Sequence, residues 1–163
     1  MKMLLATWVA LGLAGAIVGQ DRGARLAGTW RLTRLEQPGA DGSPHRVECS
    51  GLLILTEDGH MSVQVMEDNP SSQPSGGPEQ YSQGGYEASF GTFEVDERAH
   101  TFTFHVEGAL VRTLVGKDLP RAFELSGKQL IVKSTRPDEH WRVVWERYGR
   151  ALVGQAFPPA SGR

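Results

Sequence analysis

The chain of 163 residues has few of the features that mark specialised protein classes. Cys49 is its single cysteine, so no internal disulfide can form. A lone cysteine packs as a small hydrophobe more often than it reacts. The formal net charge is only -2, with 17 Lys and Arg against 19 Asp and Glu, and no basic stripe offers contacts to phosphates. We therefore expect no nucleic-acid partner.

Compact catalytic and metal-binding motifs are also missing. The five histidines are scattered, and no pair has the close spacing of a zinc motif. No G-x-S-x-G elbow or other nucleophile signature accompanies the hydroxyl residues. We expect no metal and no cofactor, and a binding protein is favoured over an enzyme.

A long apolar run is present only at the amino terminus. Lys2 precedes uncharged residues 3–18, with small residues at 14, 16 and 19. This pattern is typical of a secretory signal peptide and is short for a spanning helix, which needs about 20 apolar residues. We assign residues 1–20 to a signal peptide and expect a secreted or periplasmic protein with no stable membrane insertion after its removal. An uncleaved membrane anchor is the alternative.

From about residue 26 the chain contains short alternating runs separated by Gly, Pro, Asp and Ser, and no convincing helical periodicity. The expected strands cover residues 28–36, 51–56, 60–67, 87–96, 101–107, 121–125, 129–134 and 141–148. Short turns make consecutive strands hairpin neighbours. The sequence predicts an all-β fold, an eight-stranded antiparallel up-and-down barrel over residues 26–149, with a loosely ordered tail at 150–163.

Four residues at the two ends of this region indicate how such a barrel would close. Gly28 lets the first strand fold over the base, and Trp30 plugs it. Near the other end, Trp145 and Arg147 lie in the last expected strand, and the arginine can stack on an indole. We assign all four to barrel closure.

Two longer segments interrupt the hairpins. Residues 68–85 are rich in Pro, Ser, Gly and Gln, which favours a flexible flap. Residues 108–120 mix apolar and charged side chains and are placed to lie across a barrel mouth.

Several runs, in order and with plausible spacing, resemble the bacterial and fungal lipocalin-like domain family. The matching runs are Leu26–Leu32, Gly51–Gln64, Phe90–Asp96, His105–Gly108, Val115–Gly116 and Val144–Arg147. The resemblance implies a lipocalin-type barrel with a presumed small-molecule site, and it places a shared histidine at His105. It bears on fold more strongly than on function.

Strand alternation sorts the candidate polar residues without stating which face is the lumen. In residues 101–107, His105 and Glu107 share one face and the aromatic residues share the other. If the polar face is inward, His105, Glu107 and Arg121 form a polar patch in an apolar cup, able to bind a carboxylate or enol or to transfer a proton. If the aromatic face is inward, His105 and Glu107 are solvated.

The apolar candidates for the ligand site are Met61, Val63 and Phe90. An apolar cavity would recruit such residues, and so would a solid core, so both interpretations stand. Our leading hypothesis is an exported barrel that binds a small, largely apolar or amphipathic molecule, with His105 and Arg121 as polar anchors. The alternatives are an isomerase, cyclase or hydrolase that uses His105 as acid or base, and an envelope structural module with a packed interior.

Overall fold

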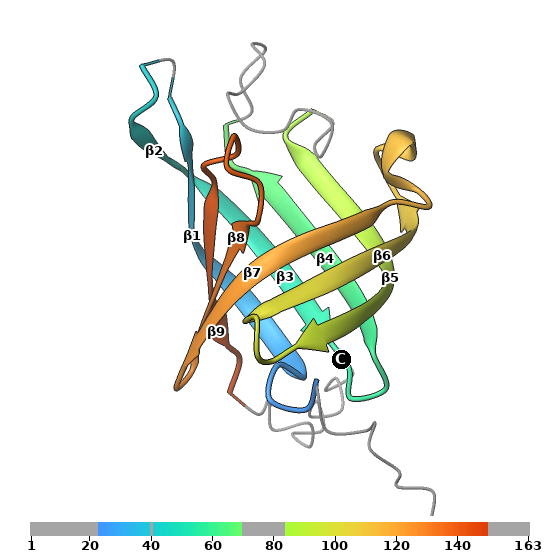
Figure 1. Cartoon of the computed structure of the whole chain (residues 1–163). Coiled ribbons are helices and arrows are strands. Elements are labelled where there is room, and N and C mark those ends of the chain that lie inside the picture. Colours follow the sequence, from blue (N-terminus) through green and yellow to red (C-terminus); the bar gives the residue numbers. More distant parts are fainter. Residues whose placement is uncertain (1–22, 40, 70–83, 150–163) are drawn as a thin grey trace, which may run out of the picture.

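The computed structural model describes residues 23–39, 41–69 and 84–149. Within these ranges, antiparallel strands form one sheet that curls into a barrel (Figure 1). The strands are β1 (Gly28–Pro38), β2 (Pro44–Val47), β3 (Cys49–Leu55), β4 (His60–Glu67), β5 (Tyr86–Asp96), β6 (Thr101–Ala109), β7 (Asp118–Ser126), β8 (Gln129–Ser134) and β9 (Arg142–Arg147). The 3-10 helix η2 (Arg112–Leu114) lies between β6 and β7.

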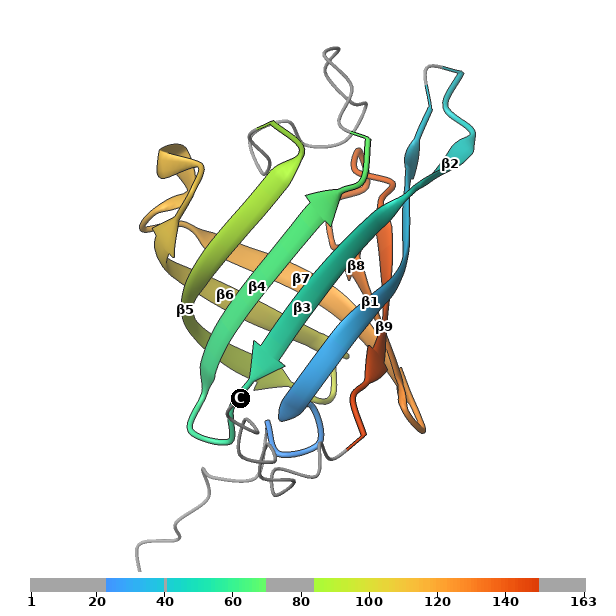
Figure 2. The same cartoon turned by 180° about the vertical axis from the view of Figure 1, so that it is seen from behind.

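The barrel is closed by β1, which pairs with both β3 and β9 (Figure 2). Trp30 lies opposite Leu53 of β3, and Leu32 lies opposite Trp145 of β9. Strands β1 and β3–β9 thus form the eight-stranded antiparallel barrel that the sequence predicts, and the fold class is confirmed.

The short strand β2 was not expected from the sequence. It pairs with the second half of β1, with Leu35 opposite Val47 and Pro38 opposite Pro44. It is only four residues long, and the side chains at its first three positions are exposed. It therefore has no apolar alternation from which a strand could be predicted. It extends beyond the barrel wall at the end of β1 (Figure 1).

Strand β6 shows which face of the sheet points inward. Phe102, Phe104 and Val106 are each no more than 3% exposed, whereas the residues between them are half-buried. The aromatic face therefore lines the interior of the barrel (the lumen), and the face with His105 is the outer wall.

One end of the barrel, here called the base, is packed solid. The Trp30 side chain is fully buried and its indole Nε1 donates to the carbonyl of Leu26 at 3.0 Å. Aromatic rings continue the packing: the centroids of Phe93 and Phe102 are 6.3 Å apart with an edge-on geometry, and Phe123 lies 6.4 Å from Phe102.

Arg147 covers the outer side of the base. Its guanidinium lies over the Trp30 ring, 4.0 Å from the centroid, and donates to the carbonyls of Arg25 and Ala27. Gly28 has a φ of +147°, and a β-carbon there would collide with the Arg147 guanidinium. The expected closing group of Gly28, Trp30 and Arg147 is thus assembled, and Trp145, 3% exposed, packs into the same core.

The connection between β6 and β7 lies at the end opposite the base. Residues 110–117 fold back over the end of β6. There the Gly116 N–H donates a hydrogen bond to the Val106 carbonyl at 2.8 Å, and Leu114 is buried. Most of the expected flap, residues 70–83, lies outside the described residues, as do residues 1–20 and 150–163. In the described ranges, no helix has the length and hydropathy needed to cross a membrane.

Candidate functional site

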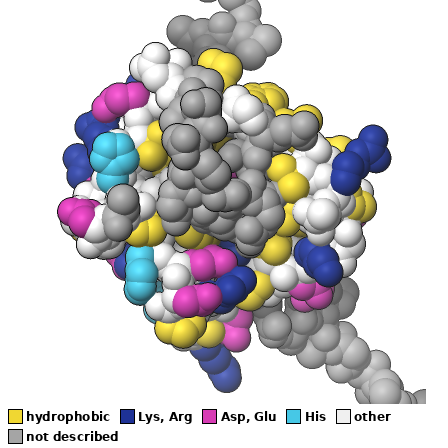
Figure 3. All heavy atoms as spheres, turned by 90° about the horizontal axis from the view of Figure 1, so that it is seen from above, with side chains coloured by type: hydrophobic (Ala, Val, Ile, Leu, Met, Phe, Trp, Pro, Cys, Tyr) yellow, Lys and Arg dark blue, Asp and Glu magenta, His cyan; other side chains and the backbone are white. Residues whose placement is uncertain are grey.

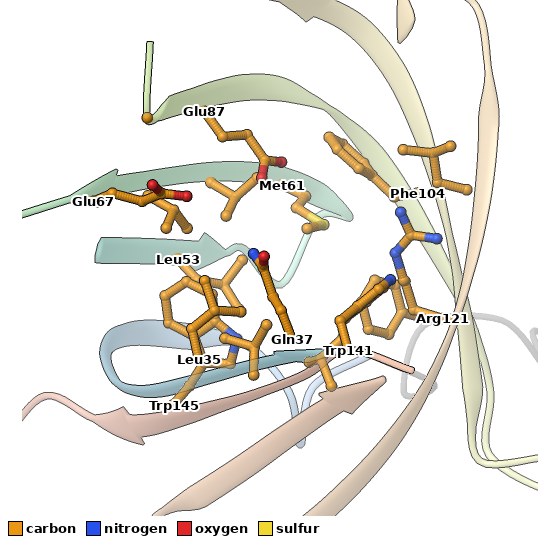
Figure 4. Close-up of a pocket in the computed structure, with 17 residues that line it drawn as sticks. Leu35, Gln37, Leu53, Met61, Glu67, Glu87, Phe104, Arg121, Trp141 and Trp145 are labelled. Atoms are coloured by element: carbon orange, nitrogen blue, oxygen red, sulfur yellow. The ribbon is translucent and has the colours of Figure 1, made fainter. Parts of the chain in front are cut away.

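Above the packed base the lumen contains a cavity of about 140 Å³ (Figure 4). Its wall is mainly apolar and is built by inward-facing residues of strands far apart in the sequence. The apolar lining consists of Leu35, Leu53, Met61, Val63, Val65, Phe102, Phe104, Leu119, Val132, Trp141, Val143 and Trp145. Such a hollow, apolar with a few polar groups, is the usual form of a small-molecule site.

Four polar side chains face this cavity: Gln37 from β1, Glu67 from β4, Glu87 from β5 and Arg121 from β7. Gln37, Glu67 and Glu87 lie at the mouth end of their strands, and Arg121 lies near the middle of β7, opposite Phe102 of β6. In Figure 4 the side chains of Gln37 and Glu87 point toward the centre of the hollow, and Arg121 extends along one side of it between Trp141 and Phe104. The cavity thus has an apolar floor and a polar upper part.

The Glu87 carboxyl has a strongly perturbed acidity. Burial in the apolar lumen raises the pKa of its carboxyl to about 7, and the positive charge of Arg121 opposes this rise without cancelling it. The carboxyl therefore changes charge near neutral pH. A titrating carboxyl in a cavity is a common mark of a functional site.

Gln37 presents a polar atom without a partner. Its side-chain Oε1 is buried and accepts no hydrogen bond from the described residues. A buried acceptor left unsatisfied costs about 1–3 kcal/mol, so a ligand donor at this point would gain that energy back.

Arg121 is held on an aromatic platform. Its Cζ lies 5.1 Å from the centre of the Trp141 ring, and its Nη1 donates to the carbonyl of Pro120 at 3.0 Å. The Trp141 indole in turn donates to Glu139 Oε2 at 3.2 Å, and the Ser134 hydroxyl donates to the same oxygen at 2.7 Å. The guanidinium is therefore positioned by the strand β8–β9 connection.

The structure places His105 on the outer wall, which corrects the expectation that it points into the lumen. Its ring Nδ1 lies 2.7 Å from Asp118 Oδ1, directly across from it in the β6–β7 ladder. The physical reason is strand alternation: Phe104 and Val106 fill the lumen, so the residue between them must face outward. Its Nε2 is buried and meets no hydrogen-bond partner among the described residues.

Glu107 and Phe90 also lie outside the cavity. A register shift pairs Phe90 with Gly108 and Gly91 with Val106, which leaves Glu107 out of the ladder and exposed. The Phe90 ring is 56% exposed and covers Gly108, where a β-carbon would collide with it. The two residues expected in the ligand site are instead part of a bulge on the outer wall.

The remaining predicted site residues do meet in one place. Arg121, Met61 and Val63 all line the cavity, Met61 and Val63 each with 8% exposure. Sequence reasoning missed Gln37, Glu67, Glu87 and Trp141. The signal for Glu67 was available, because it continues the alternation of Met61, Val63 and Val65 on β4.

Charged side chains of both signs are present among the described residues at the mouth end. In Figure 3, which views the barrel from above, acidic and basic side chains stand among apolar ones. Within the described ranges, no three histidine, cysteine or acidic side chains gather where they could hold a metal ion.

Comparison with known proteins identifies the family. A search of curated proteins finds no match. The family model described as lipocalin-like domain matches residues 27–148, which are the whole of the closed barrel. The eight-stranded antiparallel barrel, its plugged base and its apolar lumen agree with that match, and the chain belongs to the lipocalin-like domain family.

Proposed function

We propose that this protein binds a small, largely apolar molecule in the lumen of its barrel. The observation that carries this proposal is the apolar cavity above the packed base, whose wall contains few polar side chains. The family match, which fits ligand binding in general, supports it. A barrel with a structural role alone has no need of such a hollow, because side chains can fill an eight-stranded interior.

The size of the cavity limits the ligand. At about 140 Å³ it is close to the engineered cavity of about 150 Å³ that accepts benzene. A ligand with one ring and a short substituent fits this space. Burial of about 150 Å² of apolar ligand surface contributes about 4 kcal/mol before the cost of association, so polar contacts must supply any higher affinity.

Arg121 is the polar anchor expected from the sequence that also lines the cavity. The acid–base enzyme based on His105 loses its support, because the imidazole lies on the outer wall beside Asp118 and not in the lumen. Export of the protein remains a proposal that depends on residues 1–20, which lie outside the described residues.

Filling the cavity tests the proposal. Val65 lines the lumen on β4, and its neighbour Gln64 faces outward. We expect Val65→Trp to occupy the hollow and abolish binding of a single-ring probe such as ethylbenzene, followed by NMR shifts of the backbone amides. The matched control Gln64→Trp adds the same ring outside and should bind as the wild type does.

Two results would count against a binding function. One is that neither ethylbenzene nor indole shifts the amides of the lining residues in the wild-type protein. The other is that Val65→Trp binds these probes as well as the wild type does, because the binding site would then lie elsewhere.

A further inference from the structure

We propose that the ligand carries an amine, and that this group binds between the Gln37 Oε1 atom and the Glu87 carboxylate in the upper part of the cavity. The inference rests on the proposed function and deepens it, since it assigns a chemical class to the polar end of the ligand. That class is a small apolar body with one protonated primary or secondary amine.

The first support is the balance of acceptors and donors around the cavity. Glu67, Glu87 and the orphaned Oε1 of Gln37 supply acceptors from β4, β5 and β1. Arg121 on β7 supplies donors, and its guanidinium is already stacked on Trp141 and bonded to the Pro120 carbonyl. A ligand group that donates hydrogen bonds therefore complements the site better than one that accepts them.

The second support is electrostatic. Among the described residues, the charged groups that line the cavity are Glu67, Glu87 and Arg121, and the inward faces of β3, β6, β8 and β9 contribute apolar side chains there. With both carboxylates ionised, these groups carry one net negative charge. An ammonium group would balance that charge, whereas a carboxylate ligand would add a third negative group to a poorly solvated space.

The third support is the state of Glu87 itself. Burial in an apolar wall raises the pKa of this carboxyl to about 7 despite the opposing effect of Arg121, so the ionised form is poorly stabilised in the empty lumen. A cation beside it favours the ionised form. Amine affinity should therefore rise with pH through this range, and the affinity for an uncharged isostere should not.

The test uses the full chain and four probes of similar shape: benzylamine, benzyl alcohol, ethylbenzene and phenylacetate. Their affinities are measured at pH 6 and pH 8 from NMR amide shifts. The variant Glu87→Gln removes the negative charge of Glu87 and keeps the size of its side chain. Glu94→Gln is the matched control, because Glu94 lies on the same strand with its side chain exposed on the outer wall.

We expect benzylamine to bind about 10- to 100-fold more tightly than ethylbenzene at pH 8, as a charged hydrogen bond implies. Between pH 8 and pH 6 its affinity should fall about tenfold, as Glu87 takes up a proton. Glu87→Gln should remove both the preference for the amine and its pH dependence. Glu94→Gln should keep both.

The inference is overturned if phenylacetate or ethylbenzene binds as tightly as benzylamine at pH 8. It is equally overturned if Glu87→Gln leaves the affinity for benzylamine unchanged. In both cases the aromatic probes still occupy the cavity, so the binding function stands and only the ligand class is wrong. If no probe binds at all, the proposed function fails first.

Discussion

The buried carboxyl of Glu87 makes the stability of the fold depend on pH. An acid whose pKa is raised on folding keeps its proton in the folded state at pH values where the unfolded chain has lost it. For Glu87 the window runs from the ordinary value of 4.5 to about 7. The folded state is therefore favoured at low pH, loses stability as pH rises through this window, and stays at the lower level above it.

This sign leads to a prediction for Glu87→Gln. At pH 8 the variant should be more stable than the wild type by about 2 kcal/mol, because it no longer has to bury a carboxylate. At pH 4.5 the two should differ by less than about 0.5 kcal/mol. Urea unfolding at both pH values measures the difference. A variant that is less stable than the wild type at pH 8 would contradict the buried position of the carboxyl.

The position of single polar residues was the hardest feature to predict from the sequence. Arg121, Met61 and Val63 line the cavity as expected, whereas His105, Glu107 and Phe90 lie on the outer wall. Alternation gives two faces, and only burial of one of them decides which is the lumen. In residues 101–107 the buried face is the aromatic one. The orientation of this strand therefore follows from burial of its apolar residues and not from a grouping of its polar ones.

At the scale of a single strand, β6 offers a direct check of this orientation. Phe104 is 3% exposed and lines the cavity, and the adjacent His105 faces Asp118 on the outer wall. We expect Phe104→Ala to lower the free energy of unfolding by about 3–5 kcal/mol, since it leaves a void. His105→Ala should cost less than about 1 kcal/mol, because its hydrogen bond to Asp118 is partly exposed to solvent.

Ligand affinity gives the second readout for the same pair of residues. His105→Ala should bind ethylbenzene as the wild type does, measured by NMR titration, because its side chain does not reach the lumen. A loss of binding in this variant with the fold intact would reverse the orientation derived for β6.

The elements themselves were largely predictable. Gly, Pro and Asp mark the turns, and period-two alternation marks the strands, so all eight barrel strands fall within a few residues of their expected bounds. β2 was missed because its pairing with the end of β1 depends on the neighbouring chain and not on its own apolar pattern. The bulge that expels Glu107 likewise has no local signature beyond Gly91 and Gly108.

At the scale of the whole molecule, the packed base and the cavity occupy different halves of the barrel. The base contains fully buried Leu26 and Trp30, with Arg147 stacked on the indole. The upper part contains the cavity, whose wall includes Arg121 stacked on Trp141. The closed base could be predicted from the Gly28–Trp30 and Trp145–Arg147 runs. The volume of the cavity could not, because it depends on how every lumenal side chain packs.

This division predicts opposite effects for two tryptophans. Trp30 is fully buried in the base and does not line the cavity, so Trp30→Ala should lower the free energy of unfolding by about 3–5 kcal/mol. The folded fraction should still bind ethylbenzene within about twofold of the wild-type affinity, a change of less than 0.5 kcal/mol. Trp141 lines the cavity and carries Arg121, so Trp141→Ala should weaken binding about tenfold or more.

Urea unfolding and NMR titration of both variants separate the two effects. Trp141→Ala should lose less than about 2 kcal/mol of stability, because its side chain is only partly buried and its loss widens an existing hollow. If instead Trp30→Ala abolishes binding while the folded state persists, the base transmits its packing to the cavity, and the two halves act as one unit. If Trp141→Ala binds normally, the ligand does not reach the polar upper part of the lumen, and Arg121 is then a structural residue of the wall.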